Sequence, residues 1–122
     1  MENRAQKYHR ERRSEALREE ITSLVEGELE DPRIDLVTVN EVQLDPGGKV
    51  ARVFVSAEGT DEEVAVSMEA LNASRGFIRH ALTVNLGLRH APELVFVLDQ
   101  SERYGNRVEE LLQRIERRKR HN

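Results

Sequence analysis

Three arginines, Arg75, Arg79 and Arg89, are the residues whose chemistry stands out, because residues 70–92 contain no aspartate or glutamate. A guanidinium donates two parallel hydrogen bonds in a planar fork, which suits a phosphate group. Arg75 and Arg79 are four residues apart, so they share one face if a single helix carries both. We therefore predict that these arginines, with the adjacent His90, contact nucleic-acid phosphates. The alternative is an ordinary solvated surface.

A short segment with two small residues around an arginine, Ser74-Arg75-Gly76, lies inside this stretch. It separates two apolar patterns of helical spacing, one ending at Leu71 and one beginning at Phe77. An interior glycine weakens a helix and can kink it, so we expect a tight bend at Gly76. A glycine also permits close approach of the backbone to a phosphate, which is the functional alternative for the same residue.

Basic residues gather again at the end of the chain. We expect them to form a flexible tail that adds non-specific phosphate affinity through counterion release, and the alternative is a frayed, solubilising terminus. The consecutive bases are Arg117, Arg118, Lys119 and Arg120. The many bases of residues 4–18 alternate with glutamates, a mixture typical of a salt-bridged helix face.

Other chemistries find little support in the sequence. An enzyme acting on RNA would need a carboxylate cluster or an acid–base pair, and no motif links the aspartates at the predicted element ends, Asp31, Asp35, Asp45 and Asp99. The chain has no cysteine, and its four histidines lack metal-ligand spacing. We therefore expect no catalytic residue, no metal and no cofactor. We also expect the aromatic residues to pack in the core.

A second hypothesis concerns an acidic segment. Residues 58–69 contain five acids and no base, and the net charge of the whole chain is −4. The segment could form a helix face that docks a basic protein. Binding by such a protein-interaction module would depend on Glu62 and Glu63 and would survive loss of the arginines.

The length of 122 residues predicts one domain, comprising a core fold over about 5–100 and a charged helix with a basic tail over about 101–122. Helical spacing predicts four helices. The first covers about 4–30, the second begins at residue 60, the third follows the bend, and the last covers 103–118. Valine-rich runs predict strands over 36–44, 49–57 and 93–99, with a bulge near Asn40. This order indicates an α+β fold with helices on one sheet face. With no leader or membrane-length apolar run, we expect a cytoplasmic protein, and we expect no small-molecule substrate. With no coiled-coil heptads and no long exposed apolar stripe, we expect a monomer.

Five motifs, in this order and spacing, resemble the bacterial ribosome-binding factor A family over nearly the whole chain. They are Glu30-Asp31-Pro32-Arg33-Ile34, Ala51-Arg52-Val53-Phe54-Val55-Ser56, Gly76-Phe77-Ile78-Arg79, Leu88-Arg89-His90-Ala91-Pro92-Glu93-Leu94 and Ser101-Glu102-Arg103-Tyr104-Gly105. The resemblance implies a KH-like fold of the type whose extra helix comes first. It also implies a non-catalytic factor that binds the small (30S) ribosomal subunit and its 16S rRNA.

The same resemblance implies a role in late subunit maturation, in processing of the precursor 16S rRNA and in growth in the cold, with assembly GTPases as functional neighbours. Two positions depart from the family pattern. Ser74 stands where the family has alanine, and its hydroxyl adds a candidate phosphate contact. Gly87 stands where relatives tend to carry a base, which weakens the expected basic patch.

Overall fold

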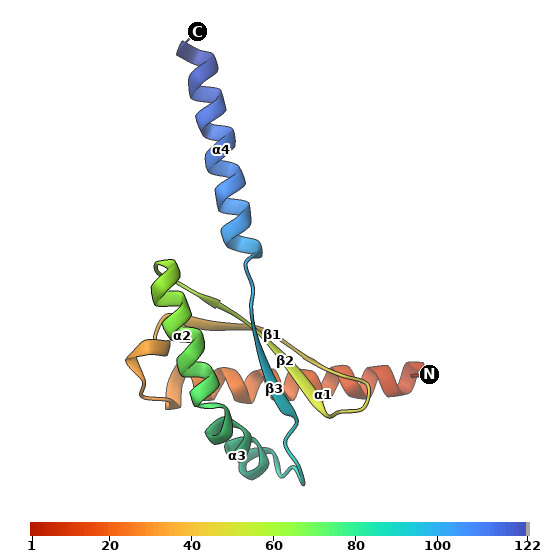
Figure 1. Cartoon of the computed structure of the whole chain (residues 1–122). Helices are drawn as coiled ribbons and strands as arrows, with labels where there is room; N and C mark the ends of the chain where they lie inside the picture. The colour runs from red at the N-terminus through yellow and green to blue at the C-terminus, as the bar shows by residue number, and fades with distance from the viewer. Residues whose placement is uncertain (122) are drawn as a thin grey trace.

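The structure, a computed structural model, describes residues 1–121, without the side chains of 101–107 and 121 (Figure 1). In chain order the elements are α1 (Arg4–Ser23), a π-helical turn (Leu24–Glu28), a 3-10 turn (Pro32–Ile34), β1 (Val37–Leu44), β2 (Val50–Ala57), α2 (Asp61–Ala73), α3 (Arg75–Leu86), β3 (Glu93–Leu98) and α4 (Ser101–His121). This is the predicted α+β order, with the extra helix first, as in KH-like folds.

β2 lies at the centre of the three-stranded sheet, between β1 and β3. It pairs antiparallel with β1 through a tight hairpin, and parallel with β3. A parallel pair needs a crossover, and α2 and α3 provide it. The register of β1 shifts between Val39 and Glu41, which confirms the predicted bulge.

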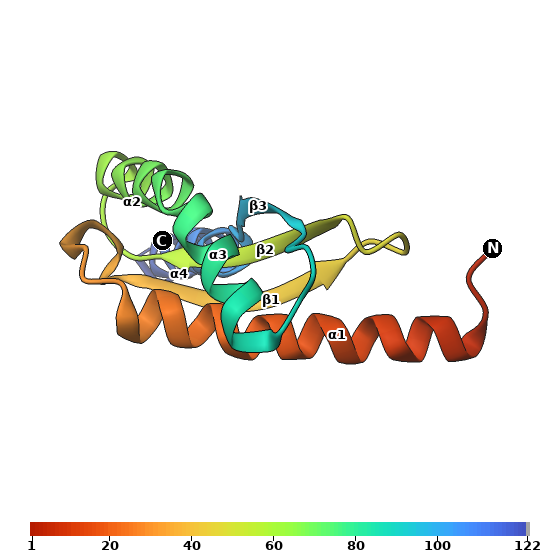
Figure 2. The same ribbon diagram turned by 90° about the horizontal axis from the view of Figure 1, so that it is seen from below.

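Helices cover one face of the sheet, and the other face is open. The paired residues Val39, Val55 and Leu98 belong to the inward face, whereas Thr38 of β1 and Arg52 of β2 are exposed on the other face. α1 packs along β1, while α2 and α3 pack against β3 (Figure 2). Fully buried side chains from the helices complete this core, namely Ile21, Leu24, Leu71, Ile78 and Leu82. Helical periodicity therefore predicts these five core residues correctly.

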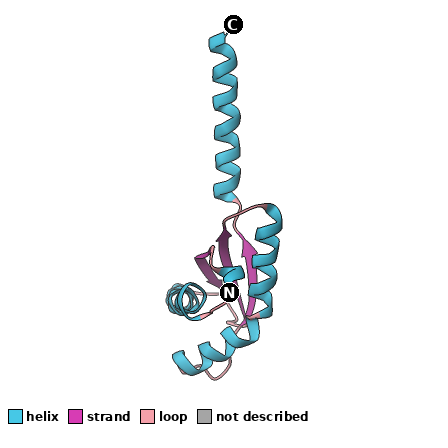
Figure 3. Cartoon of the chain, turned by 90° about the vertical axis from the view of Figure 1, so that its left-hand side faces the viewer, coloured by secondary structure: helices cyan, strands magenta, loops and turns pink. Residues whose placement is uncertain are grey.

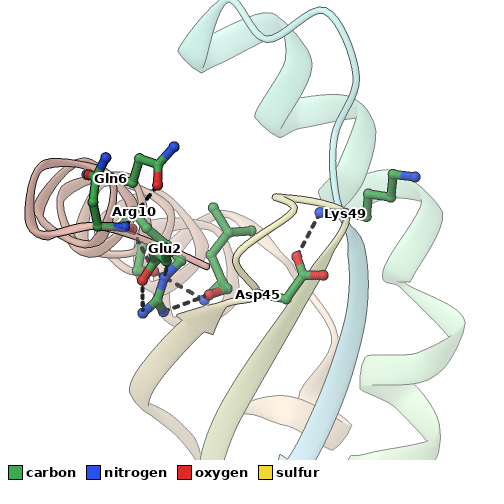
Figure 4. A network of polar contacts seen from close by, with 8 residues as sticks. Glu2, Gln6, Arg10, Asp45 and Lys49 are labelled. Carbon is green, nitrogen blue, oxygen red and sulfur yellow. Dashed lines mark hydrogen bonds and ion pairs between the residues drawn. The ribbon is translucent and has the colours of Figure 1, made fainter.

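Polar contacts tie α1 to the β1–β2 hairpin (Figure 4). The Arg10 guanidinium donates to both carboxylate oxygens of Glu2, at 2.7 and 3.0 Å, and to the carbonyl of Leu44 at 3.0 Å. In the hairpin loop the Asp45 carboxylate accepts the backbone N–H groups of Lys49 and Val50, at 2.7 and 3.0 Å. The Val50 N–H is the main reason that the pKa of Asp45 lies below its ordinary value.

Local signals explain where the crossover helices begin and end. The Thr60 hydroxyl accepts the N–H of Glu63, and the Glu63 carboxylate accepts the N–H of Thr60, which is a capping box at the start of α2. α3 ends at Gly87, whose φ of +64° lies in the left-handed region that glycine adopts without strain. Gly87 thus has a structural role, because it terminates the helix.

α4 extends away from the sheet in line with β3 (Figures 1 and 3). Its apolar stripe is exposed: Val108 is 37%, Leu111 56%, Leu112 57% and Ile115 50% accessible. Among the described residues, no helix is both long enough and apolar enough to cross a membrane.

Candidate nucleic-acid interface

The bend between the two crossover helices lies at Ser74, and the prediction that Gly76 makes it is wrong. Ser74 is at once the C-terminal cap of α2 and the residue that precedes α3. Its N–H donates to the Ala70 carbonyl at 3.0 Å, and its carbonyl accepts the N–H of Ile78 at 3.0 Å. The small serine therefore lets one helix end and the next begin without an intervening loop.

Gly76 lies inside the first turn of α3, and its exposed backbone does not have a positive φ. A Cβ built on it meets nothing within 4 Å. The fold thus has no steric need for glycine here, although glycine costs about 0.5–1 kcal/mol relative to alanine inside a helix. A bare backbone at this point would leave room for close approach by a ligand.

Arg79 anchors the loop between α3 and β3. Its guanidinium donates through Nε to the Pro92 carbonyl and through Nη2 to the Ala91 carbonyl, both at 3.0 Å. Nη2 also lies 3.6 Å from a carboxylate oxygen of Glu93. Arg79 therefore has a structural task that the sequence did not indicate, and its proposed phosphate contact would be additional to that task.

Arg75, Arg89 and His90 are exposed. Arg75 begins α3 and lies one helical turn before Arg79, on the same face. Arg79 ties the end of the loop that carries Arg89 and His90 to α3. The exposed bases of α3 and of the loop before β3 together make up the candidate RNA-contact surface.

The C-terminal bases do not join this surface. Arg117, Arg118, Lys119 and Arg120 are exposed near the end of α4, at the opposite end of the molecule from α3 (Figure 1). They belong to a helix that continues to His121, so the flexible tail expected from the sequence is not what the structure has. Any phosphate contact that they make would be a second, separate one.

Phe77 is the residue that sequence reasoning missed. We expected it in the core, but 56% of it is accessible, and it lies on α3 between Gly76 and the buried Ile78. An exposed aromatic ring is suited to stacking on a nucleic-acid base. Phe77 is two residues from both Arg75 and Arg79 and therefore lies on another face of α3. The signal that could have found it is the helical phase, because Ile78 and Leu82 define the buried face and Phe77 lies outside it. Phe54 and Phe96 are half-buried, and the side chain of Tyr104 lies outside the described residues.

Asp31 and Asp45 are among the candidate carboxylates that are engaged in local structure. Asp31 accepts the N–H of Arg33 at 3.0 Å and pairs with its guanidinium at 2.7 Å, and this pairing lowers the pKa of Asp31. Asp45 orders the hairpin loop in the same way. Within the part of the chain that the structure describes, no three potential metal ligands of the His, Cys, Asp or Glu type gather.

The fold is that of a small KH-like protein, with exposed arginines on its third helix and on the loop that follows it. The family model described as ribosome-binding factor A matches residues 9–112. The ribosome-binding factor A of Koribacter versatilis is 57% identical over 119 residues, which are 98% of this chain and 97% of that one. The protein of the same name from Thermomicrobium roseum is 41% identical over 109 residues, 89% and 84% of the two chains. The chain belongs to the ribosome-binding factor A family.

Solved structures agree with this assignment. The crystal structure of ribosome-binding factor A from Thermus thermophilus superposes with a TM-score of 0.67 at 27% identity, covering 75% of this chain and 97% of that one. The solution structure of a Thermotoga maritima relative gives a TM-score of 0.61 at 38% identity, covering 73% and 89%. A homology model of the T. thermophilus protein, fitted into a map of its complex with the 30S subunit, gives 0.60 at 29% identity, covering 71% and 91%.

Proposed function

We propose that this protein binds the 30S ribosomal subunit and contacts the phosphates of 16S rRNA through Arg75, Arg89 and the bare backbone at Gly76. The observation that supports the proposal is the exposure of Arg75 on α3 and of Arg89 on the loop whose end Arg79 ties to that helix. The 30S complex of the T. thermophilus relative supports the choice of subunit. Ser74, Arg79 and His90 line the same surface, and Arg117–Arg120 supply a second one on α4.

The mechanism would be binding without bond-making. Phosphate contacts position a protein on RNA through charge and shape, whereas base contacts specify sequence. A factor that binds one rRNA conformation more tightly shifts the population toward that conformation, and nothing more is needed to aid folding of the subunit. Phe77 would add stacking on an unpaired base.

The wider role follows from the family. We propose that the protein acts in the cytoplasm in late maturation of the small subunit, aids processing of the precursor 16S rRNA, supports growth in the cold and is functionally linked to assembly GTPases. Residues 5–100 would form the subunit-binding core, and 101–122 an accessory arm. The monomeric state stays a prediction, although its original premise, the lack of an exposed apolar stripe, does not hold for α4.

The test is co-sedimentation of the purified protein with 30S subunits, and with protein-free 16S rRNA, at two salt concentrations. We expect binding to both, weakened as the salt concentration rises, because each neutralised phosphate releases counterions. Failure to bind mature or precursor subunits at low salt would reject the proposal.

The substitution Gly76→Ala distinguishes an effect of this position on stability from an effect on 30S binding. Alanine has open space at this position, so we expect the free energy of unfolding to rise by about 0.5–1 kcal/mol. If a phosphate approaches the backbone, the added methyl group lowers 30S affinity in the same protein. Urea unfolding and co-sedimentation measure the two effects. A more stable variant that binds with wild-type affinity would remove Gly76 from the site.

A further inference from the structure

A groove of about 290 Å³ lies at the opposite end of α2 from the bend. Three segments build it: the turn before β1, the residue that follows β2 and the first two turns of α2. Its walls include the apolar side chains of Leu36 and Val66, which are 50% and 44% accessible. Carboxylates lie on its rim. The groove plays no part in the RNA-contact surface.

The groove is held in shape by hydrogen bonds between its walls. The Ser67 hydroxyl, on the buried side of α2, donates to the Arg33 carbonyl at 2.7 Å. The Glu58 N–H donates to the Leu36 carbonyl at 3.2 Å. These bonds join α2 and the end of β2 to the turn before β1, so the two exposed apolar side chains keep their separation.

The charge around the groove is almost entirely negative. Glu58, Glu62 and Glu63 line it, whereas Arg33 is the single base among its described lining residues. The Arg33 guanidinium is paired with Asp31 at 2.7 Å, which offsets its charge. An RNA phosphate brought to this rim would meet like charges, and a cationic side chain would meet opposite ones.

We propose that this groove docks a basic segment of a protein. An aliphatic side chain of that segment inserts between Leu36 and Val66, and flanking lysines or arginines pair with Glu58 and Glu62. The proposal rests on the proposed function, since it takes the partner to be a protein of the small subunit. The groove lies away from the loop before β3 (Figure 1), so the cationic end would hold RNA while the acidic end holds protein.

The first experiment places a photo-activatable benzoylphenylalanine at Val66 in the full chain, bound to 30S subunits. A matched probe replaces Val84, which is 65% accessible on α3. We expect the probe at position 66 to cross-link to a lysine- or arginine-rich segment of a ribosomal protein. Cross-links from position 66 to rRNA alone, or none from a complex that co-sediments, would overturn the proposal.

The second experiment reverses charge at the rim. We expect Glu58→Lys/Glu62→Lys to lower 30S affinity about fivefold to tenfold, because two exposed pairs become repulsive. The control Glu11→Lys/Glu19→Lys makes the same net change on the exposed face of α1. Both variants should bind protein-free 16S rRNA alike. Equal 30S affinity of the two variants would refute the docking site, whereas loss of binding by the wild-type protein would refute the proposed function itself.

Discussion

Arg75→Glu/Arg89→Glu is expected to lower the affinity for 30S subunits by about 10- to 100-fold near physiological salt, because two phosphate contacts become repulsive. The slope of log K against the logarithm of the salt concentration should fall in magnitude by about two, because each lost phosphate contact removes about one. Both side chains are exposed, so circular dichroism should show an unchanged fold. Arg79 is left intact because its guanidinium holds backbone carbonyls. Co-sedimentation across a salt series measures the effect.

The matched control is Arg117→Glu/Arg118→Glu, which makes the same change of net charge at the far end of α4. A smaller loss in the control would place the main contact on α3 and its neighbouring loop. An equal loss in both variants would mean that the main contact is not on α3 and its neighbouring loop.

Arg79→Ala should lower the free energy of unfolding by about 2–3 kcal/mol, because hydrogen bonds from a charged donor contribute more than neutral ones. Two carbonyls, those of Ala91 and Pro92, lose their donor, and Pro92 is buried. Urea unfolding measures the change. We also expect weaker 30S binding, since the loop that carries Arg89 is no longer held against α3.

Arg75→Ala is the control for that experiment, since an exposed substitution on the same helix should stay within about 0.5 kcal/mol of wild type. If Arg79→Ala were as stable as Arg75→Ala, the contacts to the loop would not contribute to the fold. Arg79 would then be available as an ordinary phosphate ligand.

The sheet and most helix boundaries could be predicted because their signals are local. Alternation of valines marks β1 and β2, and the slip at Asn40 marks the bulge. Asp45 and the loop that follows it identify the hairpin. The position of the bend was misjudged because glycine is the stronger signal in a sequence, whereas the helix break at Ser74 depends on how α2 and α3 pack against the sheet.

The sequence indicated most of the residues that belong to the candidate site but not which contacts they make. The acid-free stretch pointed to Arg75 and Arg89, both of which are exposed. The role of Arg79 depends on two hydrogen bonds to carbonyls twelve and thirteen positions further along the chain. The periodicity of a sequence does not reveal such contacts. The exposure of Phe77 depends on which side of α3 faces the sheet. Adjacent helix positions point in different directions, so Ile78 is buried and Phe77 is exposed.

The parallel pairing of β2 with β3 has a consequence for synthesis of the chain. α1 and the β1–β2 hairpin involve neighbouring segments and can form early, but the edge of β2 that pairs with β3 stays open until residue 98 has been made. Chains elongate at about 5–20 residues per second and expose unpaired strand edges meanwhile. Every nascent copy therefore passes through an interval of seconds in which the central strand has a free edge, and chaperones or rapid packing of α2 and α3 would protect it from aggregation.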